Sequence, residues 1–108
     1  MPADMSRLET IRKIVEQQPN DPFARYGLAM ELKNAGQHDA AHAEFEELEK
    51  RHPAYVPQFL MHANLLADLK RLDEARACLE RGIEAARKSG NQHALGEMQG
   101  ALDQLGQT

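Results

Sequence analysis

A repeat of 34 residues is the feature that most constrains the fold of this chain. Four apolar positions recur at that offset: Ala29 on Ala63, Leu32 on Leu66, Ala41 on Ala75, and Phe45 on Leu79. Two prolines, Pro22 and Pro57, open the corresponding segments one residue out of phase. Self-similarity at a fixed period is typical of supersecondary units that bury their apolar faces against their neighbours. The repeat therefore predicts a chain assembled from similar hairpins.

The composition favours helices as the elements of these hairpins. Of the 108 residues, 42% are hydrophobic and 28% are charged, with two Tyr, three Phe and no Trp. Alanine, leucine, glutamate, glutamine and arginine, which suit helices, are abundant. A chain of this length supports one core of modest size. We therefore expect a single all-α domain over residues 1–108.

The first helix is predicted from a capping signal. Ser6 followed by Glu9 has the spacing of a capping box, in which each side chain satisfies the backbone N–H of the other residue. Apolar residues then follow at helical steps: Leu8, Ile11, Ile14 and Val15. A helix is expected over residues 6–18, before Pro19. Because the 34-residue offset maps Pro53 onto Pro19, this helix would be the second half of an incomplete repeat.

Five further helices are expected, joined by short turns. Asp21 can cap a helix that has Pro22 in its first turn, and Asn91 can cap the last helix. Gly36 can adopt the left-handed conformation that ends a helix, whereas Lys70 stands at the corresponding later turn. The predicted helices cover residues 22–34, 38–51, 57–69, 72–89 and 92–105. Residues 106–108 are expected to fray.

This spacing resembles the tetratricopeptide repeat family, whose pattern combines small, bulky apolar and aromatic positions with a closing proline. Residues 22–53 match it as a first full repeat through Leu28, Ala29, Leu32, Gly36, Ala41, Phe45 and Pro53. Residues 57–88 match it as a second through Phe59, Ala63, Leu66, Ala75 and Leu79. Arg25 departs from the pattern, which has an aromatic residue there. Residues 91–105 would form a capping helix.

The resemblance implies a fold and a set of helix contacts. The fold would be a right-handed stack of antiparallel helical hairpins, an α-α superhelix of about six helices. Where two helices cross closely, a small side chain lets a bulky one enter the groove. We therefore expect Ala29 with Ala41, and Ala63 with Ala75, at the helix crossings.

The helix over residues 22–34 is apolar on two sides, and only one of them is needed for packing within its repeat. In the family, the opening helices line a concave surface that takes peptides or helices from partner proteins. The resemblance implies that the second side belongs to this surface. The predicted groove residues lie on the two opening helices: Phe23, Tyr26, Met30, Lys33, Asn34, Leu60, Asn64 and Asp68.

The predicted function is that of a non-catalytic scaffold that binds an apolar peptide or an amphipathic helix of a partner protein. Two alternatives stay open. Phe23, Tyr26 and Met30 could simply pack on the first or last helix, or the same side could make a homodimer without a separate ligand. The set of basic and asparagine residues with which some tetratricopeptide domains clamp a C-terminal carboxylate is not evident here.

Charge and composition exclude several other classes of partner. A formal net charge of −4 provides no field that would attract nucleic acid or an anionic membrane surface. No apolar run approaches the length of a membrane span, and the N-terminus lacks an apolar signal segment. The single cysteine, Cys78, fits a reducing compartment and is expected to be a small packing residue. A cytoplasmic protein is expected.

No catalytic, metal or cofactor site is predicted. The chain has no glycine-rich phosphate loop, no paired-cysteine motif and no nucleophile elbow. His38, His42 and Glu46 have helical spacing for a metal, but a solvated polar face is the preferred interpretation. Gly96 and Gly100 lie one turn apart in the last helix, where they indicate either close approach of another backbone or a loosely held helix.

Overall fold

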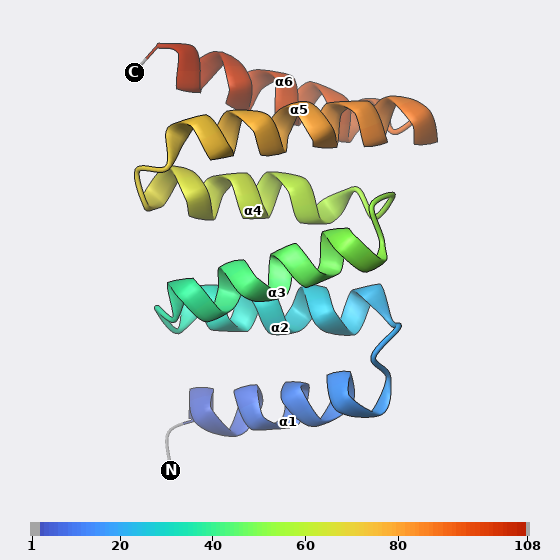
Figure 1. The fold of residues 1–108 in the computed structure, drawn as a ribbon, viewed down its shortest axis with the longest axis vertical. Helices are drawn as coiled ribbons and strands as arrows, with labels where there is room; N and C mark the ends of the chain where they lie inside the picture. The colour runs from blue at the N-terminus through green and yellow to red at the C-terminus, as the bar shows by residue number, and fades with distance from the viewer. Residues whose placement is uncertain (1–2, 108) are drawn as a thin grey trace. The chain divides into compact units, whose positions relative to one another are not determined.

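The computed structural model describes residues 3–107, and side chains from Arg7 onward. Within that range the chain forms six helices and no strand, which confirms the predicted all-α class (Figure 1). The helices are α1 (Ala3–Gln17), α2 (Pro22–Asn34), α3 (His38–Arg51), α4 (Pro57–Asp68), α5 (Leu72–Ser89) and α6 (Gln92–Gly106). None of them is long and apolar enough to cross a membrane.

The helices belong to two compact units, which are described separately. Unit 1 (Met1–His52) contains α1, α2 and α3, and unit 2 (Pro53–Thr108) contains α4, α5 and α6. In each unit two neighbouring helices run antiparallel as a hairpin, α2 with α3 and α4 with α5 (Figure 1). The helices α2 to α6 begin and end within one residue of the expected positions.

In unit 1 the hairpin of α2 and α3 forms the core, and α1 packs on α2. The buried apolar residues of the hairpin are Leu28, Ala29, Leu32, Ala41, Phe45 and Leu48. Ala29 and Ala41 are fully buried on two helices that contact each other, as expected for small residues where helices cross. The repeated positions of this hairpin therefore hold its two helices together.

Two expectations about the first helix were wrong. The helix begins at Ala3, so Ser6 lies inside it and does not cap it. Residues 3–5 contain neither Gly nor Pro, and an acidic side chain near a helix N-terminus is favourable, so nothing in the sequence stops the helix at Ser6. Ile14 is 40% exposed rather than buried with Leu8 and Val15, because at about 100° per residue it lies roughly a third of a turn away from both.

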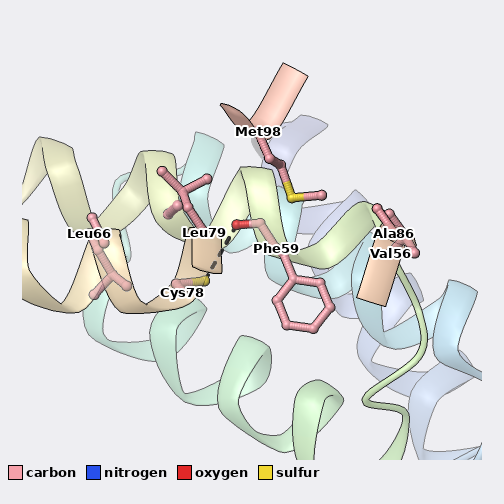
Figure 2. Packing of buried hydrophobic residues seen from close by; sticks show 9 residues of the cluster. Val56, Phe59, Leu66, Cys78, Leu79, Ala86 and Met98 are labelled. Atoms are coloured by element: carbon pink, nitrogen blue, oxygen red, sulfur yellow. Dashed lines mark hydrogen bonds between the residues drawn. The ribbon is translucent and has the colours of Figure 1, made fainter. Parts of the chain in front are cut away.

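In unit 2, α5 packs against both α4 and α6, and α6 also contacts α4. The core cluster includes Phe59 and Leu66 of α4, Cys78 and Leu79 of α5, and Met98 of α6 (Figure 2). The Cys78 thiol donates a hydrogen bond to the carbonyl of Phe59, at 3.4 Å. The interpretation of Cys78 as a packing residue is therefore confirmed.

The turns and helix starts use the residues predicted from the sequence, and at one turn a lysine takes the place of the glycine. The Asp21 carboxylate accepts from the N–H of Phe23 at 3.0 Å, and the Asn91 side chain accepts from the N–H of Ala94 at 3.0 Å. Gly36 has φ +78°, the left-handed conformation that was expected. Lys70, 34 residues later, has φ +63°, so a lysine makes the turn that a glycine makes in unit 1.

Candidate functional site

The second side of α2 remains partly open, although α1 packs on this helix. Phe23 is 74% exposed, and it is the more exposed of the two large apolar side chains, Phe23 and Ile14, that are exposed among the described residues. Tyr26, Met30 and Lys33 are half-buried, and Asn34 is exposed. The buried residues Leu28, Ala29 and Leu32 occupy the other side of the helix. The expected two-sided character of α2 is therefore present in unit 1, with Phe23 as its most open apolar group.

The opposite, packed side of α2 is fixed by Arg25, which stands where the family has an aromatic residue. Arg25 is 8% exposed, and its Nη1 donates to Oε1 of Glu44 on α3 at 2.7 Å. Its Nη2 lies 3.4 Å from the carbonyl oxygen of Pro19, in the turn between α1 and α2. A charged residue on the core side of α2 thus ties this helix to α3 and to the preceding turn.

Arg51 at the end of α3 holds the same turn from another direction. Its Nη1 donates to the carbonyl oxygen of Pro19 at 3.2 Å and to Oδ1 of Asn20 at 3.0 Å. Its Nε donates to Oε2 of Glu47 at 2.5 Å, and this hydrogen bond holds the pKa of Glu47 below its ordinary value. The guanidinium groups of Arg25 and Arg51 therefore both contact the carbonyl oxygen of Pro19. These contacts help to position the turn before α2, the helix that carries Phe23.

The remaining predicted groove residues belong to α4, in unit 2. Leu60 is half-buried and packs against the core cluster of that unit. Asn64 and Asp68 are exposed. The prediction thus draws five residues from unit 1 and three from unit 2. Of the three predicted groove residues on α4, Asn64 and Asp68 are exposed, whereas Leu60 is partly covered by the core cluster of unit 2.

The histidine pattern is now defined in space. His42 Nε2 lies 3.4 Å from Oε1 of Glu46, and His38 is exposed at the start of α3. Within residues 3–107, no group of three or more histidine, cysteine, aspartate or glutamate side chains is placed to hold a metal ion. Of the two interpretations of Gly96 and Gly100, the described structure favours the loosely held helix, since nothing lies within 4 Å of a Cβ atom added at either glycine.

Gly82 is the glycine that matters for packing, and the sequence analysis did not single it out. A Cβ atom added there would lie 2.5 Å from the Met98 sulfur and 2.9 Å from Cγ of Phe59. The three residues come from α5, α6 and α4, so the glycine is where all the helices of unit 2 meet. A glycine inside an otherwise uninterrupted helical pattern was the available signal.

Comparison with known proteins places this arrangement in a family. A sequence model of the tetratricopeptide repeat matches residues 32–98, and a second model of the same repeat matches residues 10–43. A tetratricopeptide repeat domain protein from Salinibacter ruber, solved by NMR, is 39% identical; the match covers 81% of this chain and 88% of that one, with a TM-score of 0.77. The chain belongs to the tetratricopeptide repeat family.

More distant structures share the fold. The TPR2B domain of yeast Sti1, in complex with pHsp70, superposes with a TM-score of 0.86 at 15% identity, over 93% of this chain and 80% of that one. PcrH in complex with the chaperone binding region of PopD gives a TM-score of 0.86 at 12% identity, over 94% of this chain and 77% of that one. No protein of curated function matches the chain.

Proposed function

We propose that this protein is a scaffold that binds an apolar peptide or an amphipathic helix of a partner protein on the open side of α2. The carrying observation is Phe23, which is 74% exposed on a helix whose other side already fills the core. Exposing a large aromatic side chain forgoes the free energy of burying it, and such groups dominate the energetics of protein interfaces. Tyr26 and Met30 supply adaptable contacts beside it.

The family supports a binding role in general terms. Tetratricopeptide proteins are generally interaction modules, and two structures of the same fold are complexes, the Sti1 domain with pHsp70 and PcrH with the chaperone binding region of PopD. The exposed α4 residues Asn64 and Asp68 belong to unit 2, and we propose them as a separate candidate contact set. The proposed role is non-catalytic, as is general for tetratricopeptide interaction modules.

The test begins with a ligand selected on the protein itself. A displayed library of short peptides is panned on the full chain, and the affinity of the best binder is measured by calorimetry. Phe23→Ala should weaken binding at least about tenfold, because a central aromatic contact is worth more than about 1.4 kcal/mol. Helical circular dichroism should not change, since Phe23 packs little in the free protein.

Ile14→Ala provides the matched control, because Ile14 is an exposed apolar residue on α1. Equal losses from Phe23→Ala and Ile14→Ala, or no loss from Phe23→Ala, would contradict the assignment to α2. Asn64→Ala and Asp68→Ala test the α4 set in the same assay. Leu60 is a poor probe because it packs against the core of unit 2, so that its substitution would change stability as well as binding.

The same exposed phenylalanine favours one alternative, a homodimer formed through α2. Sedimentation equilibrium separates the two functions. A mass that doubles at high concentration in the wild type but not in Phe23→Ala would assign the surface to self-association. A monomer throughout the concentration range would rule the homodimer out.

A further inference from the structure

The helix α6 packs on unit 2 through one buried side chain and several partly buried ones. Among its described residues only Met98 is buried, at 1% exposure, whereas Leu95, Leu102 and Leu105 are half-buried. The Met98 side chain lies beside Phe59 (Figure 2), over the notch that Gly82 leaves on α5. An unbranched thioether fits such an irregular gap well. Met98 is therefore the apolar contact of α6 that is best shielded from water, and the half-buried residues around it pack at the edge of the cluster.

The sequence of α6 weakens this helix further. Gly96 and Gly100 lie in its interior, where each glycine disfavours helix relative to alanine. Nothing lies within 4 Å of a Cβ atom at either position, so packing does not require these glycines. By contrast, a Cβ atom at Gly82 has no room. Two glycines that packing does not require, and apolar contacts of which only Met98 is buried among the described residues, make α6 the element of unit 2 with the lowest expected cost of detachment.

We propose that α6 is a detachable internal ligand: it leaves unit 2 while α4 and α5 stay folded, and a partner helix of similar pattern takes its place. Detachment uncovers the part of the cluster against which Met98 packs, formed by Phe59 and Gly82. The surface that α6 covers on α4 and α5, called here the α6 seat, accepts an amphipathic helix in this structure. The apolar residues of that helix are spaced as Leu95, Met98 and Leu102. The partner is therefore a helix with an unbranched apolar residue between two leucine-like ones.

This inference goes beyond the proposed function, because it describes a helix-binding surface in unit 2 rather than on α2. It shares with the proposed function only the class of partner, an amphipathic helix. Its physical basis is confined to unit 2 and does not involve Phe23. A partner helix competes with α6, which is always present at high effective concentration because it is tethered. Binding at the α6 seat is therefore suppressed until the concentration or the affinity of the partner helix outweighs the effective concentration of the tethered α6.

The first experiment measures detachment by hydrogen exchange of the full chain. Amides of α6 should exchange faster than those of α4 and α5. The pair Gly96→Ala and Gly100→Ala should slow exchange of α6 about twentyfold or more, because each replacement favours helix about fivefold. Met98→Ala should accelerate it about thirtyfold or more, as expected when a buried methionine is truncated. Protection of α6 equal to that of α5 in the wild type would overturn the proposal.

The second experiment uses a labelled synthetic peptide of residues 91–107, added to full-length protein and followed by fluorescence anisotropy. The peptide should bind Met98→Ala protein about tenfold or more tightly than wild type, and the double-alanine protein more weakly than wild type. Equal affinity for all three proteins would overturn the proposal. If Met98→Ala unfolds the unit, seen as a loss of helical signal larger than α6 can account for, the double-alanine protein decides the matter.

The two proposals fail in different ways. Phe23→Ala should leave affinity for the α6 peptide unchanged, because Phe23 does not belong to unit 2. If Phe23→Ala binds the library-selected peptide as tightly as wild type, the assignment of the binding surface to α2 is refuted, and the proposal about α6 is unaffected. If the amides of α6 exchange at the same rate in wild type and in the double-alanine protein, the proposal that α6 detaches is refuted, and the assignment of the α2 surface is unaffected.

Discussion

At the scale of single residues, two turns show how much a local conformation can cost. Gly36 and Lys70 occupy equivalent turns and have φ of +78° and +63°. Glycine adopts this conformation without steric penalty, whereas an L-residue with a Cβ atom meets the following carbonyl oxygen. The lysine turn therefore stores strain that the glycine turn lacks.

Lys70→Gly should relieve that strain. We expect the free energy of unfolding to rise by about 0.5–1 kcal/mol, the gain in the folded state being partly offset by the greater freedom of glycine in the unfolded chain. Gly36→Ala, the matched change in the other turn, should lower it by about 1 kcal/mol or more. Urea denaturation of the three proteins measures both effects, and a Lys70→Gly protein less stable than wild type would contradict the account.

Gly82→Ala should destabilise the protein, although alanine is the better helix former. The added methyl group would overlap Phe59 and Met98, and overpacking of this kind costs about 1–3 kcal/mol. Gly27→Ala is the control, because Gly27 also lies within a helix and nothing is within 4 Å of a Cβ atom there. It should stabilise by about 1 kcal/mol. Thermal unfolding would contradict the prediction if both variants moved in the same direction.

At the scale of helices, the elements of unit 1 are joined by polar contacts as well as by apolar packing. The turn between α1 and α2 presents the Pro19 carbonyl to Arg25 and Arg51, and each arginine is paired with a glutamate of α3. The Arg25 pair is largely shielded from water, whereas the Arg51 pair is at the surface. The two pairs should therefore differ in what they contribute and in how they respond to conditions.

Glu44→Gln should cost about 1–2 kcal/mol, because it leaves the guanidinium of Arg25 buried without its charge partner. The control is Glu84→Gln, whose partner Arg87 has a side chain 58% exposed, and which should change stability by less than about 0.5 kcal/mol. Urea denaturation at neutral pH compares them. Equal costs for the two substitutions would show that burial of Arg25 carries no energetic weight.

The pair of Glu47 and Arg51 should make stability depend on pH. The hydrogen bond from Arg51 lowers the pKa of Glu47 in the folded protein, so the unfolded chain binds this proton more readily. The contribution of the pair is therefore complete above the ordinary glutamate pKa of about 4.3, and it is lost as the pH falls through the lower, folded value.

Glu47→Gln and Arg51→Gln test this dependence, since each removes the same pair. The difference in urea midpoint between wild type and either variant should shrink when the pH is lowered from about 6 to about 3. A difference that stays constant over this interval would exclude Glu47 as a source of acid sensitivity.

At the scale of the whole molecule, the 34-residue offset made the helix order predictable, because Ala29, Phe45 and their equivalents both recur and carry the packing. The position of Ser6 misled the prediction, since a capping pattern is local and says nothing about helix-forming residues before it. Arg25 and Gly82 could not be interpreted from sequence, because their roles depend on residues 19 and 23 positions away, Glu44 and Phe59.

The candidate surface was less predictable than the fold. Periodicity assigned Phe23 and Leu60 to the same predicted groove, yet Phe23 is open and Leu60 packs against a core. Helical spacing gives the side of a helix on which a residue lies, whereas the degree of cover depends on which other elements reach that side. Leu60 is partly covered because it packs against the core cluster of unit 2, which its helical spacing alone does not reveal.

The matching turns at Gly36 and Lys70 also bear on how such a chain can lengthen. Residues 37–70 start just after the left-handed Gly36 and end on the left-handed Lys70, so the residue before the segment and the last residue of the segment have equivalent backbone conformations. In a tandem copy Gln37 would follow Lys70 as it now follows Gly36, and no new kind of turn would have to arise. A duplication with these endpoints is a ready route by which a short protein of this kind acquires another pair of helices.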